Sequence, residues 1–263
     1  MISTTAVDMK KGRDARGRRT IRAWAVAFWL AVWQAVSMAL DQQILLVSPV
    51  RVLVRLAGLA VTAEFWGAVL FTLLRITGGF LLGAGAGVVL AGLASRFRRV
   101  EELLAPAMLT VKSIPVASFI ILALIWFSSR NLAVLISFLM VLPVIYTSTL
   151  GGIRAADRQL LEMAQVFRIP ALRRVRYLYV PQVFPYFHSA CAAALGLSWK
   201  SGVAAEVIGM PQGSIGEQLQ QAKVYLNTPD LFAWTLVIVL LSLAFEKLFL
   251  LLLRRGKRAL ERM

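Results

Sequence analysis

Apolar residues are gathered into six long runs, and polar residues separate these runs from one another. Each run is 17 to 31 residues long and contains two charges at most, whereas a membrane-spanning helix needs about 20 predominantly apolar residues. The pattern therefore predicts an all-α fold, a polytopic membrane helical bundle with six transmembrane helices. The predicted spans are residues 23–40, 65–95, 113–129, 131–153, 177–199 and 231–253.

Glycines recur every four residues in the second run, at Gly79, Gly83 and Gly87. Small residues at this spacing lie on one helix face and allow another helix to approach closely in lipid. A dinucleotide-binding interpretation does not fit these glycines, because no strand precedes them and the run is apolar throughout. We therefore expect the three glycines to be helix-packing residues.

A polar segment near the middle of the chain, residues 154–181, carries six arginines. Within it an apolar stripe has helical spacing (i, i+3, i+4, i+7), and its members are Leu160, Met163, Ala164 and Phe167. Pro170 interrupts the helix because it lacks an amide donor, and a second stripe follows at Leu172, Val175 and Tyr179. The segment is too polar to cross a bilayer, so the pattern predicts two short helices that dock onto a soluble partner. The alternative is that the first stripe lies on lipid headgroups.

The spacing of particular residues in this segment resembles a known family. Glu162-Met163-Ala164 is followed after three residues by Arg168, and after nine more by Leu178-Tyr179-Val180-Pro181. This resembles the cytoplasmic loop of ATP-binding-cassette (ABC) importer permeases, with consensus E-A-A, three residues, G, nine residues, I, one residue, L-P. Arg168 stands where the consensus has glycine, which would permit a left-handed turn. We therefore expect a different bend here, set by Ile169-Pro170. The resemblance extends over residues 45–253 and favours the permeases for nitrate, taurine and aliphatic sulfonates, a group that also holds vitamin-precursor importers.

The resemblance implies a function and a set of partners. The chain would be the permease subunit of an ABC importer with the type I fold, forming the pathway for a small solute that an external binding protein delivers. Two permease copies, most simply a homodimer, would be surrounded by membrane lipid and bind two ATPase subunits, which hold the ATP and Mg²⁺. No cofactor is expected on this chain. The ATPase-coupling residues would be Leu160, Glu162, Met163, Ala164, Phe167, Arg168 and Pro181.

Composition and charge agree with a membrane protein. Hydrophobic residues make up 59% of the chain, and the mean hydropathy is +0.73, which is typical of an integral membrane protein. With six spans and the N-terminus inside, cytoplasmic segments hold 22 of the 29 Lys and Arg residues, as the positive-inside rule predicts. The net charge of +16 therefore needs no nucleic acid. We expect a bacterial inner-membrane protein with both termini cytoplasmic, basic tails at 1–20 and 254–263, and a permease domain at 21–253.

Residues for chemistry on this chain are scarce. There is one cysteine and one histidine, which argues against a disulfide, a catalytic cluster or a cysteine metal site. No G-x-x-x-x-G-K-[ST] phosphate loop occurs. We therefore expect a transport subunit that is not itself an enzyme.

Charged residues in or beside the spans are candidate pathway groups, because a charge in hydrocarbon is costly and faces the bundle or an aqueous cavity. Arg75 either lines the pathway or is tied to backbone carbonyls. Lys200 either pairs with Glu206 across a break in the helix or attracts an anionic substrate. Residues 198–230 are rich in glycine, and we expect a broken or partly re-entrant segment followed by an external amphipathic helix.

A second function class remains open from the sequence alone. In a small ion-coupled secondary transporter, Arg75, Lys200 and Glu246 would be the coupling groups. The central docking segment and the scarcity of carboxylates in the spans argue against it. An ATPase gene beside this one would favour the importer.

Overall fold

The computed structural model describes residues 23–40 and 46–261, and the predicted basic tail at 1–20 lies outside these ranges. All regular structure in the described ranges is helical, so the all-α prediction is confirmed. The elements are α1 (Ala23–Leu40), α2 (Pro49–Ala60), α3 (Ala63–Arg96), α4 (Arg98–Ser113), α5 (Val116–Ala123), α6 (Ser129–Arg154), α7 (Arg158–Val166), α8 (Ala171–Arg174), the π-helical turn η1 (Val175–Tyr179), α9 (Val180–Gly209), α10 (Ile215–Val224) and α11 (Thr228–Glu261).

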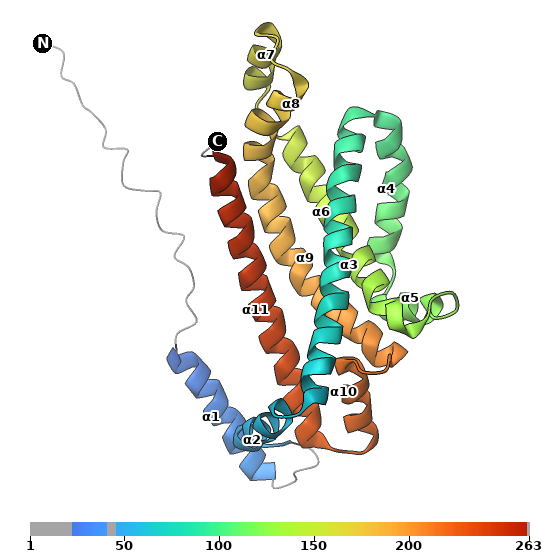
Figure 1. Cartoon of the computed structure of the whole chain (residues 1–263), viewed down its shortest axis with the longest axis vertical. Coiled ribbons are helices and arrows are strands. Elements are labelled where there is room, and N and C mark those ends of the chain that lie inside the picture. Colours follow the sequence, from blue (N-terminus) through green and yellow to red (C-terminus); the bar gives the residue numbers. More distant parts are fainter. Residues whose placement is uncertain (1–22, 41–45, 262–263) are drawn as a thin grey trace, which may run out of the picture.

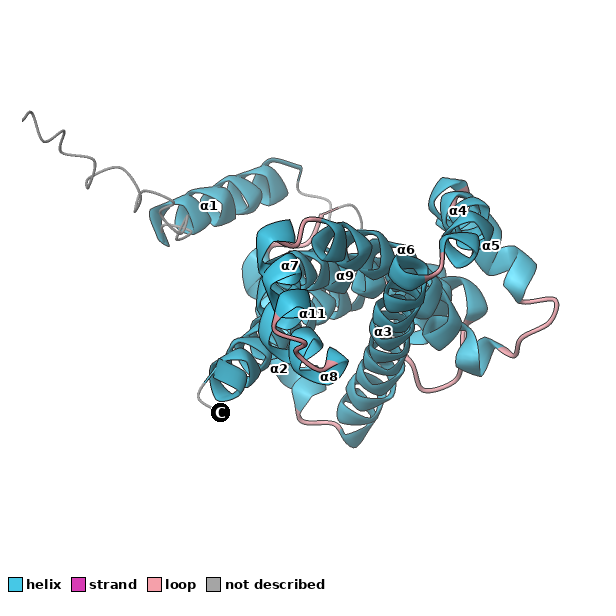
Figure 2. Ribbon diagram, turned by 90° about the horizontal axis from the view of Figure 1, so that it is seen from above, coloured by secondary structure: helices cyan, strands magenta, loops and turns pink. Residues whose placement is uncertain are grey.

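Three long helices, α3, α6 and α9, form the centre of the molecule, and α11 runs along one side of them (Figure 1). The pair α7–α8 extends beyond one end of this bundle, and α2 and α10 lie at the other end. Seen along the bundle, α1 and the α4–α5 pair lie on different sides of it (Figure 2). The central segment that the sequence singled out is thus separate from the packed core.

The spans differ in part from the sequence prediction. By length and apolar composition, α3, α6 and α11 qualify as membrane spans, and the bent pair α4–α5 makes a fourth. The predicted span at 113–129 is not a single helix, because α4 ends at Ser113 and α5 turns by 103° from it. Pro115 causes the break, since proline offers no amide donor and pushes Ile114 into extended backbone. The eight residues of α5 cover about 12 Å, too short to cross a bilayer.

Close packing of α3 against α6 depends on the glycines spaced by four. Gly79, Gly83 and Gly87 are buried, and a Cβ atom added to any of them would lie within 3.0 Å of an α6 atom. A Cβ added to Gly78, Gly85 or Gly92 on the same helix would meet nothing within 4 Å. The four-residue spacing therefore coincides with the contact face of α3.

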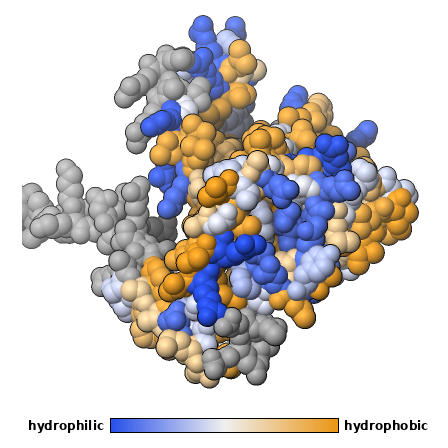
Figure 3. All heavy atoms as spheres, turned by 60° about the horizontal axis from the view of Figure 1, so that its bottom comes forward, coloured by the Kyte–Doolittle hydropathy of each residue, from blue (hydrophilic) through white to orange (hydrophobic). Residues whose placement is uncertain are grey.

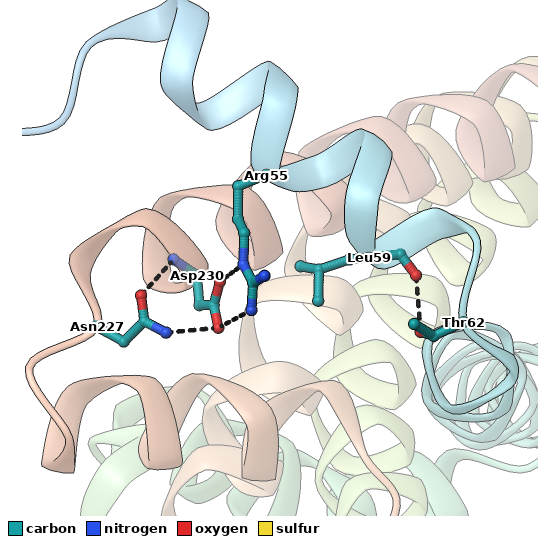
Figure 4. Close-up of polar contacts among 5 residues, drawn as sticks. All are labelled: Arg55, Leu59, Thr62, Asn227 and Asp230. Atoms are coloured by element: carbon teal, nitrogen blue, oxygen red, sulfur yellow. Dashed lines mark hydrogen bonds and ion pairs between the residues drawn. The ribbon is translucent and has the colours of Figure 1, made fainter.

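The end of the bundle that carries α2 and α10 is held by a polar clamp (Figure 4). Arg55 of α2 forms a two-pronged ion pair with Asp230 in the first turn of α11, with Nη2 donating to Oδ2 at 2.9 Å. Asn227 donates to the same oxygen at 2.7 Å. Thr62 closes the end of α2 by donating its hydroxyl to the Leu59 carbonyl at 2.7 Å. Viewed from near this end, a polar area lies between apolar surfaces (Figure 3).

Candidate functional site

The segment that contains α7 and α8 is tied back to the bundle at its start. Asp157 caps α7 by accepting a hydrogen bond from the Gln159 amide at 2.8 Å. The Asp157 amide in turn donates to the side-chain oxygen of Gln182, in the first turn of α9, at 2.8 Å. Past α8, the chain continues through η1 into α9 without a loop. Helical structure therefore runs from α8 into α9 without interruption.

The bend between α7 and α8 is a Schellman motif centred on Arg168. Arg168 has a left-handed backbone with φ 50°. Its amide donates to the Gln165 carbonyl at 3.0 Å, and the Ile169 amide donates to the Ala164 carbonyl at 2.9 Å. The expectation of a different bend set by Ile169-Pro170 is wrong: the left-handed turn is kept, with arginine in the conformation that favours glycine. Pro170 instead stands at the N-cap of α8.

The apolar stripe of α7 is divided between the inside and the surface. Ala164 is fully buried within the chain, whereas Phe167 is 72% exposed. Leu160, Met163, Glu162 and Pro181 are also exposed. Ala164 is thus part of the fold of this segment, and the exposed apolar side chains beside it form the outer surface. We call Leu160, Met163, Val166, Phe167 and Leu172 the outer apolar patch.

Two members of this patch, Val166 and Leu172, were not among the predicted coupling residues. Val166 is 79% exposed and Leu172 is 82% exposed. Val166 lies off the helical stripe that was used to select candidates. Leu172 was recognised as apolar, but its exposure depends on how the bend orients α8, which spacing alone does not specify.

A second polar centre lies where α9 ends, around the fully buried Glu206. Its Oε2 accepts from the Thr72 hydroxyl of α3 at 2.7 Å and from the Gly216 amide of α10 at 3.3 Å. The same Thr72 hydroxyl accepts from the Ile215 amide at 3.1 Å. Gly216 permits this approach, since a Cβ there would lie 2.3 Å from the Cβ of Glu206. These bonds join α3, α9 and the first turn of α10.

The expected break lies within residues 198–230, and the helix α10 follows it. Helix α9 continues unbroken through Lys200 to Gly209, and the chain turns at Met210, which has φ 45°. The proposed pairing of Lys200 with Glu206 is therefore wrong: Lys200 is exposed, and Thr72 and Gly216 bind the Glu206 carboxylate. The signal for this break is present in the sequence. Ser214 accepts from the Glu217 amide at 3.0 Å, and Ser-x-x-Glu is the capping-box spacing.

The side chain of Arg75, the third candidate pathway residue, contacts a backbone carbonyl and an aromatic ring. Its Nε donates to the backbone carbonyl of Arg130, and its guanidinium carbon lies 3.7 Å from the centre of the Phe71 ring. This is the tie to a backbone carbonyl that the sequence left as one of two options. Among the residues that the structure describes, no group of three or more His, Cys, Asp or Glu side chains could hold a metal ion.

Comparisons with known proteins agree with this architecture. Residues 79–260 match the family model described as "Binding-protein-dependent transport system inner membrane component". A permease of Bacillus subtilis (strain 168) assigned to aliphatic sulfonate transport is 26% identical, over 86% of this chain and 82% of that protein. The taurine transport system permease of Escherichia coli (strain K12) is 25% identical, over 92% and 88% of the two chains. A solved amino acid ABC transporter with histidines has a TM-score of 0.58 at 16% identity, covering 79% of this chain and 96% of that one, and this supports the fold.

Proposed function

Because the chain belongs to the family of binding-protein-dependent transport system inner membrane components, we propose that it is the permease subunit of an ABC importer. In this proposal two copies enclose the pathway, and an external binding protein delivers the substrate. ATPase subunits, which hold ATP and Mg²⁺, bind the α7–α8 segment at the cytoplasmic side. The observation that carries the proposal is the outer apolar patch, which lies on a capped helix pair beyond the end of the bundle.

The exposed side chains of this patch match what a soluble partner buries. Met163, Phe167 and Leu172 are apolar and exposed, while Glu162 and Arg168 beside them are charged and exposed. Interface centres are apolar with charged residues toward the rim, and aromatic anchors such as Phe167 carry much of the binding energy. An ATPase subunit with a matching groove is therefore a suitable partner for this surface.

The connection from α7 to α9 supports a lever mechanism. Closure of the ATPase pair around ATP would move α7–α8, and the continuous chain through η1 would move α9 with it. The hydrogen bond from Asp157 to Gln182 keeps the two elements together. ATP shifts the equilibrium between inward-open and outward-open states only by its differential affinity for them.

We assign the substrate to small anions of the sulfonate type. The two relatives above are named for sulfonate and taurine transport. Lys200 supplies an exposed cation on α9, one of the three central helices, and a cation at membrane depth is costly unless it has a role. The external binding protein would hold most of the selectivity.

Co-purification of the ATPase subunit tests the docking proposal. Phe167→Ala removes an exposed side chain, so the chain should still fold and insert, but ATPase retention should fall at least tenfold, about 1.4 kcal/mol of binding. Tyr225→Ala is the matched control, because Tyr225 is 79% exposed and directly follows α10, which lies at the opposite end of the bundle (Figure 1). Equal retention of the ATPase by both variants would refute docking at this patch.

Ala164→Asp, a substitution on the same helix, is a poorer test. Ala164 is fully buried within the chain, so an aspartate would place an uncompensated charge inside the segment itself. Loss of the ATPase in that variant would not separate failed docking from local unfolding.

A further inference from the structure

An apolar groove of about 630 Å³ opens between α3, α6 and α9 near the α7–α8 end of the bundle. Its walls include Val88 and Gly92 of α3, and Val183 and Phe187 of α9. Arg96 lies at the α3 end of the lining, and Thr149 of α6 is also part of it. The volume is in the range of ligand-binding cavities.

The groove lies on the same face of α3 that α11 packs against further along the bundle. Phe80 and Ala84 of α3 pack under α11, and Phe80 meets Phe249 edge to face with ring centres 4.9 Å apart. Continuing along α3 in four-residue steps gives Val88, Gly92 and Arg96, which line the groove. None of the described side chains of α11 is part of that lining. The lining residues of α3 lie further along the same helix face as Phe80 and Ala84, so the groove is an elongated apolar slot with a cation at its end.

Arg96 is the charged residue of the lining. Its side chain is exposed, with the guanidinium carbon 5.7 Å from the centre of the Phe97 ring. It belongs to none of the three ion pairs found among the described residues. An anionic group at this end of the groove would therefore meet an exposed cation that no described carboxylate neutralises.

We propose that this groove binds one anionic phospholipid, with an acyl chain along the apolar walls and the phosphate at Arg96. Basic pockets between transmembrane helices at the cytoplasmic side are sites for anionic headgroups. The charge distribution places this end of the bundle at that side. A linear chain with an anionic end matches the shape and charge of the slot. The proposal requires insertion in a membrane, and it does not depend on where the ATPase binds.

A pair of glycine substitutions tests occupation of the groove. A Cβ added to Gly92 meets nothing within 4 Å, and the same holds for Gly85, which does not line the groove. Gly92→Leu therefore fills the slot without a clash, and Gly85→Leu adds the same side chain elsewhere on α3. Each protein is reconstituted with equal amounts of phosphatidylglycerol and phosphatidylcholine and then extracted in mild detergent. Native mass spectrometry then measures the retained lipid.

The wild type is expected to retain phosphatidylglycerol in preference to phosphatidylcholine. Gly92→Leu should lose it, and Gly85→Leu should keep it. Arg96→Gln should lower retention about fivefold, equivalent to about 1 kcal/mol for one cation at a membrane surface. Arg99→Gln, which removes a nearby exposed arginine outside the lining, should have no effect. Equal retention in Gly92→Leu and Gly85→Leu, or equal retention of both lipids by the wild type, would overturn the proposal.

Discussion

Alanine substitutions along the glycine face of α3 should separate helix packing from helix propensity. The Cβ of Gly79→Ala would lie 2.5 Å from the backbone oxygen of Val134. That of Gly83→Ala would lie 2.8 Å from the oxygen of Phe138. Backbone atoms cannot rotate away, so α6 itself would have to shift. The order of destabilisation should follow these distances.

The magnitude follows from two opposing contributions. Overpacking a tight contact costs about 1–3 kcal/mol, whereas alanine in place of glycine inside a helix gains about 0.5–1 kcal/mol. Gly79→Ala and Gly83→Ala should therefore lose about 1–2 kcal/mol. Gly87→Ala should lose less than either, because its new contacts are longer, at 3.0 Å to the Cβ of Ile145 and 3.1 Å to the backbone oxygen of Leu142. Gly85→Ala has open space around it and should gain up to about 1 kcal/mol.

Thermal unfolding of the purified chain in detergent measures the difference. About 2 kcal/mol between Gly83→Ala and Gly85→Ala corresponds to about 4–8 °C in Tm for a chain of this size. A less precise test of the same packing compares the folded yield of Gly83→Leu with that of Leu81→Ala. The yield of Gly83→Leu should be lower, since Leu81 is exposed. If Gly83→Ala and Gly85→Ala unfold at the same temperature, the tight-packing interpretation is refuted.

Three further predictions concern the bend at Arg168, the hydrogen bonds of Thr72 and the substrate. Arg168→Gly should raise the free energy of unfolding of the α7–α8 segment by up to about 1 kcal/mol, because glycine adopts the left-handed backbone without strain; local hydrogen exchange measures this, and faster exchange than in the wild type would contradict it. Thr72→Val should cost about 1–3 kcal/mol, because the Ile215 amide loses its acceptor; Thr72→Ser should restore most of the Tm, and a Tm as low in Thr72→Ser as in Thr72→Val would argue against the hydrogen bond. Lys200→Ala should lower uptake of an anionic sulfonate into vesicles that hold the full transporter without affecting ATPase co-purification, and unchanged uptake kinetics would exclude an electrostatic role for Lys200.

The amino-acid sequence by itself determined the fold class, the membrane character and the family. These depend on local or strictly spaced features: the apolar runs, the spacing from Glu162 to Pro181 and the four-residue glycine repeat. Hydrophobic period and spacing are properties of a single helix, so they can be read before the helices pack. The breaks were harder to place, because Ser113–Pro115 and Met210–Ser214 each separate an apolar helix from one of mixed polarity, and the apolar runs do not end sharply there.

Only the tertiary structure decided which side chains are inside. Ala164 and Phe167 share one helical stripe, yet the first is fully buried and the second is largely exposed. The fully buried Glu206 accepts a hydrogen bond from Thr72, which is 134 residues away in the chain. The groove beside Gly92 is lined by residues of α3, α6, η1 and α9, which are distant in the chain. The environment of Glu206 and the groove thus depend on contacts between distant elements, and no pattern within a single segment specifies such contacts.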